Sequence, residues 1–309
     1  MTSIPSWETL LQGLLLHLKA SGRAKRTLED YTYQVHRFFK AHPDAWPTGL
    51  KEACLTYFSA LADESIAPAT YNLARQYLRA FFAWCAEEGA IPSSPITKLP
   101  KRKDEPKVRR IDERIIEKLL SLPDQETFAG LRDYAFMLFQ LDTGVRPGEA
   151  IRLLPYHFDF ASHHVEVPAE KAKTRTSRIL PLYVETEKAV QRLLAARHPS
   201  WRPTSPVFCT FAGKPLRVDT WAKIMQKYSE ELGHRVRPYD LRHTFAIMFL
   251  RGGGNVFSLQ EMMGHTDLTM TRRYVALAES DIKEQHEIAS PVARLVPPKG
   301  RVGRIKKRK

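Results

Sequence analysis

Hydrophobic side chains recur at helical spacing through most of the first hundred residues. After a capping signal at Thr27, apolar residues return every three or four positions as far as Phe39, which predicts a helix with one buried face. A second pattern of this kind begins at Pro68 and stops at Gly89, as expected for a helix that ends in a glycine. We therefore expect residues 1–98 to form a helical domain.

Helical patterns also dominate the second part of the chain. Apolar residues at helical spacing lead up to Gly144, and a similar pattern covers residues 241–250. Another begins near Leu259, where Ser258 and Glu261 make a capping box. These segments predict several packed helices in a second domain.

One stretch alternates with a period of two instead. Val165 and Val167 alternate with polar residues, and the apolar pair at 179–180 follows a polar stretch at 170–177. This pattern predicts a β-hairpin. We expect residues 108–290 to form a mainly α domain with a small antiparallel β-sheet.

The net charge of +14 is concentrated in two short segments. Residues 101–110 carry six basic and two acidic side chains, and residues 291–309 carry eight basic side chains and no acidic one. The first segment overlaps a basic, proline-rich stretch at 99–107, which we interpret as an extended linker between the domains. The second predicts a disordered basic tail. Both favour a polyanionic partner, either nucleic acid or an anionic membrane surface.

Composition narrows the class of protein further. With 43% hydrophobic and 27% charged residues, the chain has the composition of a globular protein. We find neither a signal peptide nor an apolar stretch of the roughly 20 residues that span a bilayer, so we expect a cytoplasmic protein. The cysteines fit neither a disulfide framework nor a zinc site, and we expect buried thiols and no metal. They are Cys54, Cys85 and Cys209.

One motif places an arginine in a tight turn. A helix breaks at Gly144 and Pro147 can begin the next one, which leaves Arg146 between them. Glu149 is close enough in sequence to orient its guanidinium group, whose planar fork suits two phosphate oxygens. Alone, this pattern more often marks a surface arginine before a helix.

Three further patterns follow along the chain. They are Lys173 and Arg178 in the predicted hairpin, Tyr239, Arg242 and His243 at the start of a helix, and His265 followed nine residues later by Tyr274. Each has an ordinary structural explanation when taken singly: a solvated lysine, a buried ion pair, or a tyrosine packed at the edge of a core.

In this order and spacing, the four patterns resemble the tyrosine recombinase (phage integrase) family over about residues 107–290. The resemblance implies a helical core-binding domain of the SAM-like type and a catalytic domain, which close around duplex DNA like a C. It also implies an enzyme that cuts and rejoins DNA through a 3′-phosphotyrosyl intermediate, acting as a homotetramer on synapsed sites. The family's reaction needs no metal and no nucleotide cofactor.

The resemblance also assigns roles to residues. Arg146 and Arg242 would hold the scissile phosphate, Lys173 would protonate the leaving 5′ oxygen, His265 would hold the phosphate, and Tyr274 would be the nucleophile. Cations suit this reaction because negative charge builds up on the phosphate in the transition state. Glu149 and His243 would support the site, and we expect DNA contacts from Lys101, Arg102, Lys103 and Arg178.

Tyr239 departs from the family pattern, which usually has histidine three residues before the second arginine. A phenolic hydroxyl can donate to a phosphate oxygen, but its pKa of about 10 makes it a poor base near neutral pH. We expect the phosphate contact to survive while proton transfer shifts to His265, His243 or water.

We therefore predict that the chain is a site-specific recombinase or integrase of a mobile element, such as a transposon. Few residues precede Thr27, so we expect no additional arm-binding domain, which favours a simple-site enzyme. The alternatives are an Xer-like host recombinase for chromosome resolution, a type IB topoisomerase, and a non-catalytic DNA-binding regulator. The membrane alternative is disfavoured because no amphipathic basic helix accompanies the tail.

Overall fold

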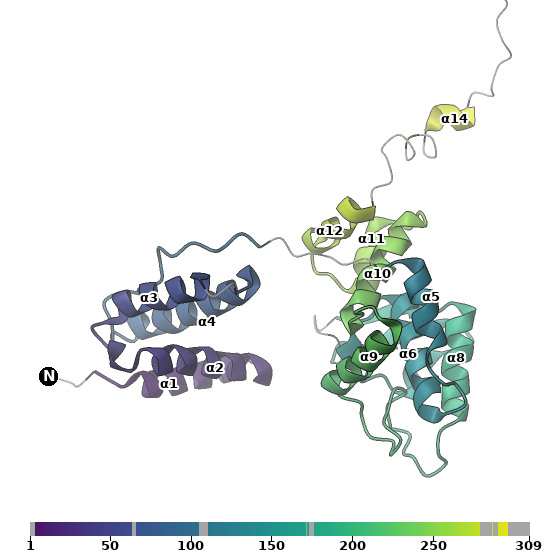
Figure 1. Cartoon of the computed structure of the whole chain (residues 1–309), viewed down its shortest axis with the longest axis horizontal. Helices are drawn as coiled ribbons and strands as arrows, with labels where there is room; N and C mark the ends of the chain where they lie inside the picture. Colours follow the sequence, from purple (N-terminus) through teal and green to yellow (C-terminus); the bar gives the residue numbers. More distant parts are fainter. Residues whose placement is uncertain are drawn as a thin grey trace, which may run out of the picture. The chain divides into compact units, whose positions relative to one another are not determined.

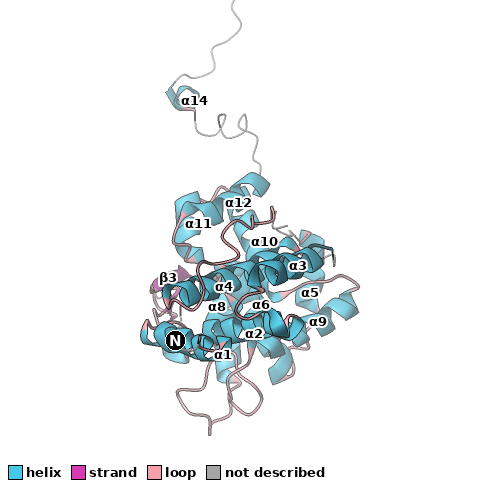
Figure 2. Cartoon of the chain, turned by 90° about the vertical axis from the view of Figure 1, so that its left-hand side faces the viewer, coloured by secondary structure: helices cyan, strands magenta, loops and turns pink. Residues whose placement is uncertain are grey.

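The computed structural model divides the chain into two compact units, Met1–Pro106 and Lys107–Lys309 (Figure 1). It describes residues 4–63, 66–104, 111–170, 172, 176–278, 286 and 290–295. Each unit has an apolar core of its own. Helices make up most of both units, and the few strands belong to the second (Figure 2). The expected mainly α fold with a small sheet is confirmed.

The first unit is a bundle built on aromatic packing. Its helices are α1 (Trp7–Ala20), α2 (Lys25–Ala41), α3 (Leu50–Asp63) and α4 (Pro68–Glu87), with a short 3-10 turn at Pro43–Ala45. Phe38, Phe81 and Phe82 are fully buried where these helices meet. Because these rings fill the core, they are not exposed as stacking platforms for DNA bases.

The N-terminus of α2 differs from the sequence prediction. The helix begins at Lys25, and its N-cap is Ala24, which makes no side-chain capping bond. The N–H of Thr27 already donates to the Ala24 carbonyl oxygen at 2.9 Å. Thr27 therefore lies inside the first turn of α2 and does not cap it. The glycine stop after α4 is as predicted, since Gly89 adopts a left-handed φ of 73°.

The beginning of the predicted linker is fixed to α4. The Arg75 Nε–H donates to the Leu99 carbonyl oxygen at 2.6 Å. Asn72 bonds both backbone groups of Arg102, accepting from its N–H at 3.0 Å and donating to its carbonyl oxygen at 2.8 Å. The Arg102 guanidinium lies over the ring of Tyr71, 5.5 Å from its centroid. Residues 99–104 thus follow the surface of the first unit.

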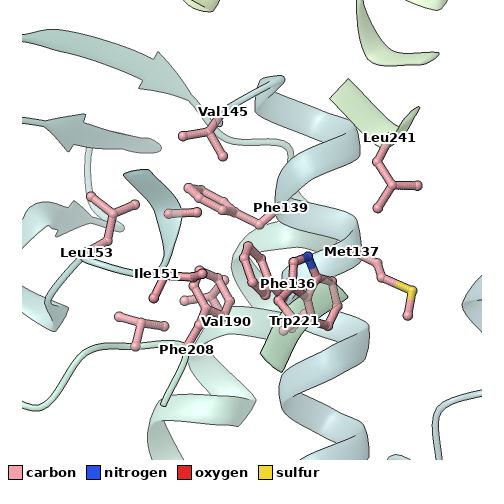
Figure 3. Close-up of a cluster of buried hydrophobic side chains, with 14 of the residues drawn as sticks. Phe136, Met137, Phe139, Val145, Ile151, Leu153, Val190, Phe208, Trp221 and Leu241 are labelled. Carbon is pink, nitrogen blue, oxygen red and sulfur yellow. The ribbon is translucent and has the colours of Figure 1, made fainter. Parts of the chain in front are cut away.

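The second unit surrounds the central helix α6 (Phe128–Thr143). Its other helices are α5 (Glu113–Ser121), α7 (Pro147–Ala150), α8 (Val184–Ala195), α9 (Val218–Leu232), α10 (Pro238–Arg251), α11 (Val256–Met263), α12 (Leu268–Ala278) and α14 (Pro291–Leu295), with a 3-10 turn at Pro155–His157. The ring of Phe136 stacks between Phe208 and Trp221, with centroid distances of 4.5 and 4.4 Å (Figure 3). This core fixes α6, and with it the loop that follows Thr143.

A three-stranded antiparallel sheet lies in the same unit. Its strands are β1 (Phe158–Asp159), β2 (His164–Val167) and β3 (Arg178–Pro181), in that order. The predicted hairpin is confirmed, because Val165 pairs with Leu180 and Val167 with Arg178. The two-residue strand β1 was not predicted, since two residues show no alternation.

Two further details concern caps and termini. The N-cap of α11 is Asn255, whose side chain accepts from the Phe257 and Ser258 N–H groups. The predicted capping box of Ser258 and Glu261 is therefore wrong, because the helix starts one turn earlier. The predicted tail begins in α14, and residues 296–309 lie outside the described part of the chain.

The three cysteines are buried free thiols, as predicted. Among the helices that the structure describes, none has the length and apolar character needed to cross a membrane.

Candidate active site

Arg146, the first arginine predicted for the site, lies in the turn between α6 and α7. Gly144 ends α6 with a left-handed φ of 62°, and a Cβ atom there would lie 2.2 Å from the Phe245 ring. Only glycine allows this turn. Arg146 is the N-cap residue of α7, and Pro147 opens that helix. The guanidinium of Arg146 donates to Glu149 Oε1 at 3.0 Å and to the Gly264 carbonyl oxygen at 3.1 Å.

The second site arginine comes from α10. Arg242 is buried, and its guanidinium donates to the carbonyl oxygens of Gly144 and Met263, the latter at 2.8 Å. Burial, and next the charge of Arg146, lower the pKa of Arg242 to about 9. This value is still above neutrality, so Arg242 remains a cation at pH 7.

Arg178 does not lie on an exposed DNA-binding surface, contrary to the sequence prediction. Its side chain is only 4% exposed, and its guanidinium pairs with Glu149 Oε2 at 2.5 Å. It also donates to the Met262 carbonyl oxygen at 2.9 Å. The reason is the alternation along β3: Leu180 is fully buried, Ile179 is 63% exposed, and Arg178 shares the face of Leu180.

The three arginines converge on the C-terminal end of α11. Three successive carbonyl oxygens, those of Met262, Met263 and Gly264, each accept a hydrogen bond from a different arginine, namely Arg178, Arg242 and Arg146. The last carbonyls of a helix have no partner inside it and carry partial negative charge. They therefore favour guanidinium groups, and Glu149 adds a full negative charge between Arg146 and Arg178.

His265 directly follows this cluster. Its Nε2 lies 3.1 Å from Arg242 Nη2, and its Nδ1 lies 2.9 Å from the hydroxyl of Thr271. Burial, and next the charges of Arg242 and Arg146, lower the pKa of His265 to about 4. The ring is then neutral at pH 7, with Nε2 accepting from Arg242 and Nδ1–H donating to Thr271.

Tyr274 completes the cluster from α12. Only 5% of the residue is exposed, and its ring lies 6.3 Å from that of His265, with 9° between the planes. Its hydroxyl is 2.8 Å from His243 Nδ1. Burial raises the pKa of Tyr274, and the charge of Arg242 opposes this in part. Burial lowers the pKa of His243.

The remaining predicted site residues are exposed, partly covered, or outside the described part of the chain. Tyr239, in the first turn of α10, is 47% exposed. Lys173 lies outside the described residues. Lys101 and Lys103 are exposed on the first unit, and Arg102 is partly covered against Tyr71.

Sequence reasoning missed Thr271. This threonine is fully buried and holds His265. It precedes Tyr274 by three residues, so the two share one helix face, and this spacing was a usable signal.

The cluster contains arginines, neutral imidazoles and a phenol, and two of its residues, Arg178 and His265, line a surface cavity. A cavity of about 420 Å³ is lined by Ser177, Arg178, Gly264, His265 and Thr266, among others. Donors fixed by a protein scaffold suit an anionic group, such as a phosphate, better than flexible surface cations do. The arrangement therefore combines fixed cations that suit a phosphate with a phenol on a helix packed against α11.

Comparison with known proteins supports this chemistry. The family model described as the phage integrase family matches residues 109–281. The tyrosine recombinase XerD of Listeria monocytogenes is 28% identical, covering 88% of this chain and 95% of its own. The tyrosine recombinase XerC of Myxococcus xanthus is 26% identical, covering 95% of this chain and all of its own.

Two solved structures share the fold. The Tn1549 transposon integrase in complex with transposon right end DNA gives a TM-score of 0.71 at 19% identity, covering 93% of this chain and 99% of that one. A lambda integrase tetramer bound to a Holliday junction gives a TM-score of 0.70 at 17% identity, covering 84% and 77%. These likenesses confirm the predicted fold.

Proposed function

Because this chain belongs to the phage integrase family of site-specific recombinases, we propose that Tyr274 is the nucleophile with which it cuts and rejoins DNA strands. This proposal rests on one observation: Arg146 and Arg242 bind carbonyl oxygens at the end of α11, and His265 contacts both Arg242 and the ring of Tyr274. Arg146 precedes Tyr274 by 128 positions in the sequence (274 − 146).

The two arginines would neutralise the phosphate during cleavage. Attack on a phosphodiester builds negative charge on its non-bridging oxygens, and prearranged cations stabilise that charge. Arg242 is buried yet still protonated at neutral pH, and Arg146 is oriented by Glu149. Both guanidinium groups therefore meet the phosphate with little loss of side-chain entropy.

Three further roles follow from the family resemblance and from the position of Tyr239. Lys173 would give a proton to the 5′ oxygen as it leaves, and the exposed hydroxyl of Tyr239 would donate to a phosphate oxygen. His265 would hold the phosphate once its Nε2 leaves Arg242 and carries the ring proton in place of Nδ1, because only an N–H group can donate to a phosphate oxygen. The phosphotyrosine bond keeps the energy of the broken phosphodiester, so the strand is rejoined without a nucleotide cofactor.

The DNA partner is a duplex recombination site. The lambda integrase neighbour is a tetramer on a Holliday junction, and the Tn1549 neighbour is bound to transposon DNA. We propose that this protein likewise acts as a homotetramer on two paired sites, with both units contacting the duplex.

The biological role is proposed as that of a mobile-element integrase. A host role in chromosome resolution is the second candidate, because the XerD and XerC relatives match over nearly their whole length. Footprinting of the bound DNA site distinguishes the two. A site at the end of an integrated element supports the first role, and one at the replication terminus supports the second.

A nicked suicide substrate tests the assignment of Tyr274. On such DNA the wild-type protein should form a covalent adduct that is visible on a denaturing gel. Tyr274→Phe should bind the DNA with unchanged affinity and form no adduct, because the attacking oxygen is gone. Tyr156→Phe, at an exposed tyrosine, is the matched control and should react normally. An adduct formed by Tyr274→Phe would refute the proposal.

A further inference from the structure

We propose that His243 is the proton acceptor for Tyr274 in strand cleavage, which makes it a catalytic residue in its own right. This inference rests on the proposed function, because it takes Tyr274 as the nucleophile. It settles where the phenolic proton goes in a protein that has Tyr239 where the family usually has histidine.

The first argument is the direct contact between the two side chains. The Nδ1 atom of His243 lies 2.8 Å from the Tyr274 hydroxyl oxygen, within the range of a hydrogen bond between a phenol and an imidazole. The two residues come from α10 and α12, which pack against each other. A base must lie within hydrogen-bond reach of the proton it removes, and His243 meets that requirement.

The second argument is that His265 is bonded to other groups and that Tyr239, a phenol, is a poor base near neutral pH. Both ring nitrogens of His265 already have partners, Arg242 at Nε2 and Thr271 at Nδ1. Tyr239 is a phenol with an exposed side chain. Among the residues that the structure describes, His243 is the histidine hydrogen-bonded to Tyr274.

The charges around His243 support a neutral ring at pH 7. Burial lowers the pKa of His243, the carboxylate of Asp240 opposes this, and the guanidinium groups of Arg242 and Arg237 lower it further. Tyr274, whose hydroxyl contacts His243, stays protonated because burial raises its own pKa. At neutral pH the phenol therefore donates to an imidazole nitrogen that can take its proton.

The step balances in protons and electrons. The proton moves from the Tyr274 hydroxyl to His243 Nδ1 while the phenolic oxygen forms its bond to phosphorus. The bond between phosphorus and the 5′ oxygen breaks, and that oxygen leaves with the proton assigned above to Lys173. In rejoining, the 5′ hydroxyl attacks the phosphotyrosine and gives its proton back to Lys173. The bond between phosphorus and the phenolic oxygen breaks, and His243 returns its proton to the departing phenolate.

The test is the single-turnover rate of adduct formation as a function of pH for His243→Asn. The amide can keep a hydrogen bond to Tyr274 but cannot take a proton. We expect the rate near pH 7 to fall by about 10²–10⁴-fold, with DNA affinity unchanged. We also expect the decline of the wild-type rate at acid pH, where His243 becomes protonated, to disappear. His198→Asn, at an exposed histidine, is the matched control and should keep the wild-type profile.

A substrate with sulfur in place of the bridging 5′ oxygen distinguishes a residue that acts as a base from one that acts as an acid. Because a thiolate leaves without taking a proton, this substrate should restore the rate of Lys173→Ala but not that of His243→Asn. Restored cleavage in His243→Asn would overturn the proposal. A wild-type rate and an unchanged acid decline in that variant would also overturn it, and would leave His243 as a packing partner only.

Two controls keep the outcome interpretable. If His243→Asn does not bind DNA, the longer amide of His243→Gln replaces it in both measurements. In an otherwise wild-type protein, His265→Asn should retain the acid decline, and its loss there would assign that decline to His265 and contradict the proposal. If Tyr274→Phe forms the adduct, the proposed function itself fails, whereas a fully active His243→Asn contradicts only the role of His243.

Discussion

A single carboxylate, that of Glu149, holds two site arginines in place. Its two oxygens accept from Arg146 at 3.0 Å and from Arg178 at 2.5 Å, and the residue is almost completely buried. A buried guanidinium group is tolerated only when its charge and its hydrogen bonds are matched. Arg178 fixes the far side of the carboxylate that orients Arg146.

Removing that carboxylate should be costly for the whole unit. Glu149→Ala leaves the side chain of Arg178 buried and unpaired, and we expect the free energy of unfolding to fall by about 3–5 kcal/mol. Glu149→Gln keeps one acceptor and should lose less. Urea denaturation followed by circular dichroism measures both variants.

The matched control is a salt bridge on the protein surface. Glu185 pairs with Lys188 at 2.8 Å, and both side chains are 60% exposed. Because solvent screens such pairs, Glu185→Gln should leave the urea midpoint unchanged. Equal midpoints for Glu149→Ala and the wild type would show that Glu149 does not hold the arginines.

At the scale of elements, the short helix α11 organises the site through its C-terminal end. It ends in Gly264, which has a left-handed φ of 60° and exposes the carbonyls that the arginines bind. A Cβ atom on Gly264 would lie 3.2 Å from Arg178 Nη1 and 3.3 Å from its Cζ. The glycine therefore permits both the backbone turn and the close approach of Arg178.

Substitution of Gly264 should slow cleavage more than substitution of a glycine that ends another helix in the same way. Gly264→Ala forces an alanine into a left-handed conformation, which costs about 1–2 kcal/mol of stability, and it also displaces Arg178. Gly233→Ala is the matched control, because Gly233 ends α9 with a φ of 66° and has nothing within 4 Å of its Cβ position.

Both variants should show a similar loss of stability from the backbone term. Only Gly264→Ala should also slow adduct formation on a suicide substrate, by about tenfold or more if one charge-assisted hydrogen bond is lost. Equal cleavage rates for the two variants would contradict a role for the α11 end in the site.

At the scale of the whole molecule, we predict two different functions for the basic residues near the end of the first unit. Arg102 is held against Tyr71 and bonded to the Ile66 carbonyl oxygen at 3.2 Å, whereas Lys101 and Lys103 are exposed. In an extended chain, alternate side chains point to opposite sides. We therefore predict phosphate contacts for the two lysines and an anchoring function for Arg102.

Salt dependence of DNA binding tests this division. Replacing Lys101 and Lys103 together by glutamine should weaken binding to all DNA sequences and flatten the plot of log affinity against log salt by about one unit per lost contact. Arg102→Gln should change that slope less and lower the stability of the first unit instead. The same slope for the lysine variant and the wild type would remove these lysines from the DNA interface.

Local sequence patterns determined the secondary structure and the list of reactive residues. The helix stop at Gly144, the start at Pro147 and the hairpin of β2 and β3 depend on backbone freedom and on periodicity within a few residues. They were therefore predictable without the fold. Helix starts were less predictable: α2 and α11 begin a turn away from the strongest capping signals.

Only the tertiary structure decided what each polar side chain does. Arg178 was expected on the DNA surface, yet the alternation that buries Leu180 also turns Arg178 inward onto Glu149. His243 stood beside Arg242 in the sequence as one of several possible bases, and the packing of α12 on α10 brings the Tyr274 hydroxyl to it. Contacts between residues 29 and 31 positions apart depend on how whole elements pack, and local pattern carries no information on that packing.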